Sequence, residues 1–189
     1  MTDSEQHVAD SIRQWVWSGF YTHSDIEQMM DDIVDDDCDV GELKSLIGPR
    51  LREKQRAERA WSAVTDCDRL DKVFYGLHEQ GICALANAGY TMSDGYSDVA
   101  EAVADAPEGH YTGFCFYHGQ DVERAVEGHG VMLAFGDLAD DEARSVRVGQ
   151  VIVEALRQAG FAVDWDGSTQ TRINLPAFDW KRRAAAQAP

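Results

Sequence analysis

The stretch FCFYHGQDVERAVEGHG, residues 114–130, decides how the second half of the chain is interpreted. Phe114 and Phe116 alternate with other residues in a period that predicts a strand with both faces partly apolar. Gly119 then allows the chain to turn, and the residues after it fit a short helix that carries Asp121 in its first turn. The stretch therefore predicts a junction between a strand and a helix, with His118 at the junction.

Short apolar segments separated by turn residues lie on both sides of this junction and predict further strands. The predicted strands are residues 82–86, 112–117, 131–135, 162–165 and 171–175. Between the third and the fourth of them, residues 141–159 carry apolar side chains on one helical face and stop before Gly160. The turn at residues 165–168 should close a hairpin with the last strand. We expect an α+β fold with a mixed sheet of about five strands packed by helices.

The first third of the chain has the apolar spacing of helices, with start and stop signals between them. Gly19 is placed to end the first helix, and Ser24 with Glu27 has the pattern of a capping box for the second. Gly48-Pro49 should break the third helix. We expect three parts along the chain: a helical N-terminal region at 1–62, an α+β domain at 63–183 and a disordered tail at 184–189.

The charge balance bounds the class of partner. The 189 residues include 34 acidic and 17 basic ones, which gives a net charge of −17. Binding to a phosphate backbone requires a surplus of Lys and Arg, so we expect no nucleic-acid binding and favour a basic protein as partner. Residues 1–42 hold twelve acids against Arg13 alone. No apolar run reaches the roughly 18 residues that cross a bilayer, and the N-terminus is acidic, so we expect a cytoplasmic protein without a membrane segment.

Neither the acidic segment nor the cysteines have the spacing of a metal site. Asp35, Asp37 and Asp39 alternate as in a calcium loop, but Val40 and Leu46 stand where an EF-hand requires Gly and Glu. A solvated loop that caps the following helix explains these acids. The cysteines form no CxxC pair and are expected to be free thiols: Cys38, Cys67, Cys83 and Cys115. We therefore predict no metal site and no cofactor.

The order of several motifs resembles that of a known family. TDCDRLDKVF, NAGYTMSDGY, FYHGQDVERAVEGHGVMLAFG and FAVDWDGSTQTRINLPAFDWKRR together resemble an uncharacterised family of bacterial proteins catalogued as a domain of unknown function. The resemblance covers residues 61–183 closely and implies a bacterial cytosolic α+β domain, with no activity to carry over. The polar positions that match the family are Asn87, Tyr90, Asp94, His118, Gln120, Asp121 and Arg124.

These positions lie in two polar segments, residues 87–94 and 118–124, and each segment follows a predicted strand. Loops carried by a rigid sheet are where binding residues concentrate. If the two strands are neighbours and end at the same edge, the segments share one cleft that could hold a small ligand or a partner loop. Ser97 is expected to begin a short helix after the first segment.

Three functions are compatible with these observations. The first is a non-enzymatic binding or interaction protein, either an immunity-like inhibitor or an adaptor, for a basic partner, because no complete catalytic constellation is present. The second is a small hydrolase or metal-assisted enzyme that uses His118 as base or ligand, and Asp121 beside it, in a cleft with the Asn87 to Asp94 loop. The third is mimicry of nucleic acid by the acidic N-terminal region. The surroundings of His118 discriminate between the first two.

Overall fold

The computed structural model describes residues 1–184, so the tail predicted to be disordered lies outside the described residues apart from Ala184. The chain forms two compact units. The N-terminal unit comprises residues 1–65 together with residues 181–184, and the sheet unit comprises residues 66–180. The helices and strands of residues 1–184 are, in chain order, α1 (Asp3–Ser18), α2 (His23–Asp31), α3 (Val40–Glu58), α4 (Asp66–Glu79), β1 (Ile82–Leu85), α5 (Met92–Asp105), β2 (Gly113–Phe116), α6 (Gly119–Val126), β3 (Val131–Asp137), α7 (Glu142–Gln158) and β4 (Ile173–Leu175). None of the helices among these residues is long and apolar enough to cross a membrane.

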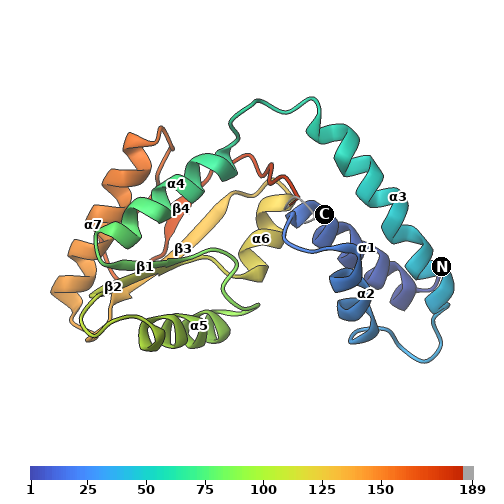
Figure 1. Cartoon of the computed structure of the whole chain (residues 1–189), viewed down its shortest axis with the longest axis horizontal. Helices are drawn as coiled ribbons and strands as arrows, with labels where there is room; N and C mark the ends of the chain where they lie inside the picture. The colour runs from blue at the N-terminus through green and yellow to red at the C-terminus, as the bar shows by residue number, and fades with distance from the viewer. Residues whose placement is uncertain (185–189) are drawn as a thin grey trace. The chain divides into compact units, whose positions relative to one another are not determined.

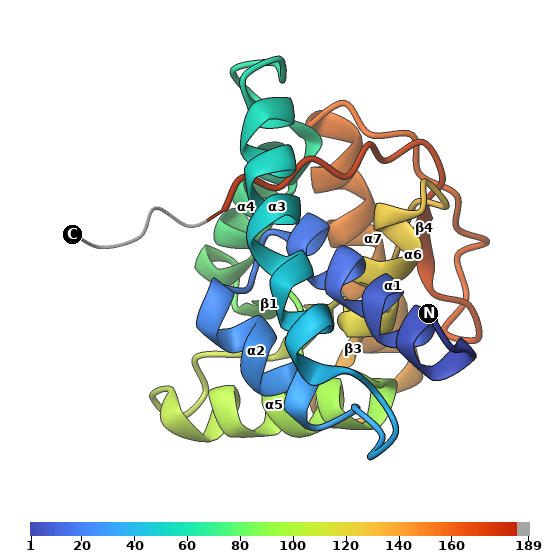
Figure 2. The ribbon, with the colours of Figure 1, turned by 90° about the vertical axis from the view of Figure 1, so that its right-hand side faces the viewer.

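The N-terminal unit is helical, as predicted, and its three helices share one apolar core (Figure 2). α1 ends at Gly19, which has a left-handed φ of 83°. α2 begins two residues earlier than predicted, because Thr22 and Asp25 form the capping box in place of Ser24 and Glu27. These caps explain where α1 ends and where α2 begins.

α3 is a single helix and contains Pro49, so the predicted break there is wrong. Pro49 is exposed, whereas Leu43 and Ile47 are buried on the opposite side and pack in the core of the unit. Proline removes one backbone hydrogen bond and crowds the preceding turn. Burial of the continuous apolar side of α3 against α1 outweighs that local penalty.

The sheet unit is a mixed α+β structure, as predicted, with four strands in the order β1-β2-β3-β4. β1 and β2 are parallel, and the other two neighbouring pairs are antiparallel. The expected strand at residues 162–165 is reduced to one bridge between Asp164 and Asn174, so the count is four rather than five. Trp165, directly after that bridge, lies edge-on against Phe135 with ring centres 5.4 Å apart, which takes this segment onto the face of the sheet.

Two helices cover each face of this sheet (Figure 1). α4 and α7 pack against one face and against each other, whereas α5 and α6 pack against β1 and β3 on the other face. α5 approaches the sheet at Gly95, where an added Cβ would lie 2.3 Å from the ring of Phe116. Only a residue without a side chain allows this close approach.

Candidate functional site

The two polar segments lie side by side at one edge of the sheet. β1 and β2 are parallel neighbours, so the segments that follow them leave from the same edge. The amide of Gly119 donates to the carbonyl of Gly89 at 2.9 Å, and the amide of Gln120 donates to the carbonyl of Tyr90 at 3.2 Å. A Cβ on Gly119 would lie 2.7 Å from the Tyr90 ring. The segments are therefore joined by backbone hydrogen bonds and by direct packing.

The first segment is organised by a helix cap. Asn87 and Gly89 have positive φ values of 53° and 54°, which turn the chain between β1 and α5. Thr91 is the N-cap of α5, and Asp94 accepts hydrogen bonds from its amide at 2.9 Å and its hydroxyl at 3.0 Å. These bonds lower the pKa of Asp94. The predicted helix start at Ser97 is wrong, since Ser97 lies inside α5 and its hydroxyl donates to the carbonyl of Ser93.

The second segment places His118 as the N-cap of α6. The amide of Asp121 donates to Nδ1 of His118 at 3.3 Å, and the amide of His118 donates to Oδ2 of Asp121 at 3.2 Å. Both residues are buried, with exposed fractions of 3% and 2%. The pair is thus a reciprocal capping box in which an imidazole takes the place usually held by a hydroxyl.

Arg172, which lies beside the edge strand β4, is the third member of this polar network. It precedes β4, and its Nη1 atom lies 2.9 Å from Oδ2 of Asp121. The guanidinium also contacts the sulfurs of Met132 and Met92, at 3.3 and 3.7 Å. Its side chain is 29% exposed, whereas that of Asp121 is 2% exposed. The buried carboxylate therefore has a cationic partner that reaches it from the solvent side.

The electrostatics keep His118 neutral. Burial lowers the pKa of His118, the positive charge of Arg172 lowers it further, and the carboxylate of Asp121 opposes both. Because Nδ1 accepts a backbone hydrogen bond, the ring proton of the neutral form lies on Nε2, which is 3.3 Å from Oδ2 of Asp121 and 3.4 Å from Nη1 of Arg172. In this arrangement neither ring nitrogen is available to a substrate.

The remaining sequence-predicted residues face outward. Tyr90 is 53% exposed and its hydroxyl donates to Oε2 of Glu123 at 3.2 Å. Partial burial and the charge of Glu123 raise the pKa of Tyr90. Gln120 and Arg124 are exposed, and among residues 1–184 no ion pair involves Arg124. Of the seven predicted positions, only His118 and Asp121 form a buried polar network.

Metal and thiol chemistry have no assembled site in the described part of the chain. Among residues 1–184 no three His, Cys, Asp or Glu side chains are grouped to hold a metal ion. Within the same residues, none of the four cysteines forms a disulfide. Burial raises the pKa of the Cys115 thiol and of the Cys83 thiol, so neither is a ready nucleophile.

The helix that follows the first segment carries a feature that the sequence reading missed. Four carboxylates of α5 stand at spacings of four, three and four residues, which places them along one line of the helix: Asp94, Asp98, Glu101 and Asp105. Tyr96 is 48% exposed at the other border of the same outward side. We call the outward side of α5, together with Tyr90, the α5 surface. Arg172 was missed as well, although its position two residues before Asn174 placed both on the side opposite to the buried Ile173.

Comparison with known proteins gives one match. The model of a family described as a domain of unknown function (DUF6891) matches residues 1–184. No curated protein and no solved structure matches the chain. The comparisons therefore supply no activity, and function has to be argued from the geometry.

Proposed function

We propose that this chain, which belongs to the DUF6891 family of domains of unknown function, is a non-enzymatic binding protein. In this proposal its α5 surface recognises a basic segment of a partner protein. Both roles considered from the sequence, an immunity-like inhibitor and an adaptor, require such a recognition step. A cation-bearing partner is the chemistry that fits this surface.

The observation that carries the proposal is the uncompensated line of carboxylates on α5. No Lys or Arg occurs between Lys72 and Arg124, and none of the ion pairs among residues 1–184 involves Asp98, Glu101 or Asp105. Like charges three or four residues apart repel one another on a helix. Asp105 also lies in the last turn, where the helix dipole disfavours an anion. Lys or Arg side chains of a partner would form attractive charge pairs with these carboxylates and so offset both the repulsion between them and the effect of the helix dipole on Asp105.

Two exposed tyrosines lie at the edges of the α5 surface: Tyr90 beside Asp94, and Tyr96 across the helix from the line of carboxylates. The ring of Tyr96 lies edge-on against Phe114 and Phe116, with ring centres 5.6 and 5.3 Å apart, so it is held in place although it is half exposed. Tyr90 is tied to the acidic helix through its amide, which donates to Asp94 at 3.3 Å. Rigid, partly exposed tyrosines are common anchors in protein interfaces, and their faces attract guanidinium groups.

The enzyme alternative has less support. It depends on His118 and Asp121, whose polar atoms are engaged in the cap of α6 and in the pair with Arg172. A catalytic base needs a nitrogen or oxygen within reach of its substrate. The binding function requires no such atom.

The test uses a basic helical peptide of about 15 residues with arginines at the spacing of the α5 carboxylates, compared with a peptide of the same composition in a different order. Fluorescence anisotropy measures binding to the wild-type chain and to the variant Asp98→Asn/Glu101→Gln/Asp105→Asn. We expect the matched peptide to bind about tenfold more tightly than the reordered one, and the variant to lose about that factor, because three charge pairs are removed.

The control variant removes the same number of charges from the acidic loop between α2 and α3, as Asp35→Asn/Asp36→Asn/Asp37→Asn. It should bind the matched peptide within about twofold of the wild type, since its carboxylates are not on the α5 surface. Equal losses in the two variants, or equal affinity for the two peptides, would mean that binding responds only to net charge and would refute the proposal.

A further inference from the structure

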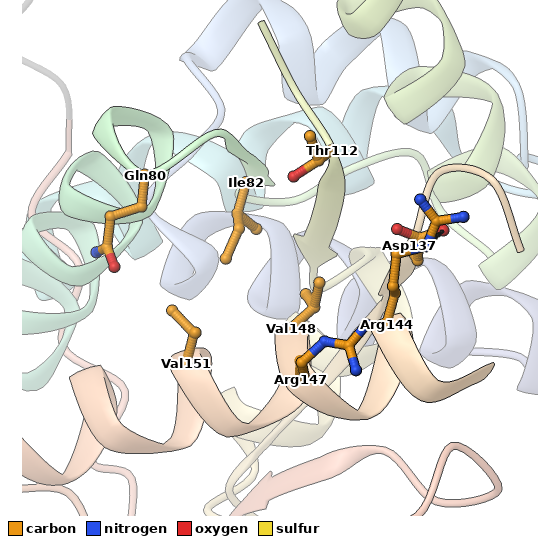
Figure 3. Close-up of a pocket in the computed structure, with 8 residues that line it drawn as sticks. All are labelled: Gln80, Ile82, Thr112, Asp137, Arg144, Arg147, Val148 and Val151. Carbon is orange, nitrogen blue, oxygen red and sulfur yellow. Dashed lines mark ion pairs between the residues drawn. The ribbon is translucent and has the colours of Figure 1, made fainter. Parts of the chain in front are cut away.

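A second feature of the sheet unit lies on the face opposite to α5. There the end of α4, the start of β1 and β2, the end of β3 and the first half of α7 surround a hollow of about 380 Å³ (Figure 3). Hollows of this size accommodate small organic molecules. It is lined by Gln80, Ile82, Thr112, Asp137, Arg144, Arg147, Val148 and Val151.

The centre of the hollow is apolar. Ile82 from the sheet and Val148 and Val151 from α7 point toward the same space (Figure 3). Val151 is 38% exposed at the mouth of the hollow. Ile82 is only 4% exposed, so a hydrocarbon group placed there would remove from water mainly apolar surface of Val148 and Val151.

The cationic side of the hollow contains two arginines, Arg144 and Arg147, whose charges both act on the carboxylate of Asp141. Arg144 lies 3.7 Å from Asp137 and 3.6 Å from Asp141, so its charge is partly balanced. The Asp137 carboxylate also accepts hydrogen bonds from the amides of Ala139 and Asp141. Among residues 1–184 no ion pair or side-chain hydrogen bond involves Arg147. Its guanidinium is the group that can take up an anion.

Two further hollows, of about 590 and 350 Å³, continue from this one along the seam between α4 and α7. Gln80 lines all three, and small apolar residues such as Ala155 and Gly76 line the continuation. The carboxylate of Glu154 stands beside the middle hollow and disfavours a second anion there. The far hollow is also lined by Lys72 and by Arg69, which is paired with Asp66. The seam therefore has cationic side chains at both ends and an apolar middle, and a ligand with one short chain uses the Arg147 end.

We propose that this seam binds a small organic anion with an aliphatic body, an alkyl carboxylate. The carboxylate lies on the guanidinium of Arg147, and the hydrocarbon chain lies over Ile82 and Val151 in the direction of Ala155. The site is independent of the α5 surface, because α5 and α7 cover opposite faces of the sheet.

The experiment titrates the full chain with hexanoate and with hexanamide, its neutral counterpart, and follows amide and methyl NMR signals. Hexanoate should bind with a dissociation constant on the order of 1 mM and shift the signals of Val148 and Val151. Hexanamide should bind about tenfold more weakly, because it cannot form the charged hydrogen bond to Arg147. Equal binding of the two molecules would overturn the proposal.

Two further measurements test separately how the carboxylate and the hydrocarbon chain of the ligand contribute to its affinity. Arg147→Gln should weaken hexanoate about tenfold, whereas Arg157→Gln, which removes an exposed arginine of the same helix outside the three hollows, should leave it unchanged. In the wild type, affinity should rise from butyrate to octanoate by about twofold to fourfold per methylene group. Equal effects of the two substitutions, or an affinity that does not change with chain length, would overturn the proposal.

Discussion

Replacement of Arg172 by methionine should destabilise the sheet unit far more than a surface arginine usually does. The substitution keeps a long apolar side chain against Met132 but removes the cation that pairs with Asp121, whose side chain is 2% exposed. Removal of one partner from a buried ion pair typically costs about 3–5 kcal/mol. Arg172 is 29% exposed and Asp121 keeps the hydrogen bond from the His118 amide, so we expect the lower end, about 3 kcal/mol.

Native-state hydrogen exchange at the amides of β2 and β3 measures this loss without contributions from the N-terminal unit. A loss of about 3 kcal/mol should lower their protection roughly 100-fold. Arg124→Met, an exposed position on α6, is the control and should change stability by less than about 0.5 kcal/mol. The double variant Asp121→Asn/Arg172→Met should recover most of the loss, because a neutral amide oxygen still accepts the His118 hydrogen bond. Equal losses of stability in Arg172→Met and Arg124→Met would refute the reasoning. So would a loss in the double variant equal to the sum of the losses in Asp121→Asn and Arg172→Met.

Three further predictions concern the same unit. Since burial and Arg172 lower the pKa of His118, folding favours its neutral form, and the free energy of unfolding should fall as pH drops below the unfolded pKa of about 6.5. Urea titrations of His118→Asn across this pH range should show a shallower fall than those of the wild type, and an equal fall would contradict the prediction. Gly95→Ala should cost about 1–3 kcal/mol in the same assay, because its Cβ would lie 2.3 Å from the buried Phe116 ring. Gly76→Ala, with nothing within 4 Å of the added Cβ, should instead stabilise α4 by about 0.5–1 kcal/mol.

The fold could be predicted from the sequence where local signals and tertiary packing agree. The strands around residue 115 and the helix of residues 141–159 have periods that match the faces they bury. Pro49 was misjudged because its penalty is local, whereas the burial that outweighs it involves a helix some 35 residues earlier in the chain. The segment at 162–165 has strand-like composition, but only Asp164 reaches a partner in the sheet. Composition does not show how many residues will pair.

The site was predictable to the extent that it depends on strand order. The two polar segments were expected to meet if their strands were parallel neighbours, and they do meet. Arg172 could not be assigned to Asp121 in this way, because the two residues are 51 positions apart with β3 and α7 between them. The line of acids on α5 was missed for a simpler reason. A helix start at Ser97 leaves Asp94 in a loop, whereas the start at Thr91 puts it on the same line as Asp98.

The distribution of charge in the sheet unit is compatible with the two proposed binding surfaces. Five of its seven basic residues lie on α4 and α7, and none lies on α5. The two helix layers are separated by the sheet, and packed layers lie about 10 Å apart, so the surfaces are about 20 Å from one another. This separation exceeds the Debye length of about 8 Å at physiological salt. The acids of α5 therefore have little effect on an anion bound at Arg147, and each surface responds to its own neighbouring charges.

Binding of a basic peptide at α5 depends on several exposed charge pairs and should weaken steeply as salt rises. Binding of an alkyl carboxylate depends on one charge pair and on apolar contact, and its affinity should change much less over the same range.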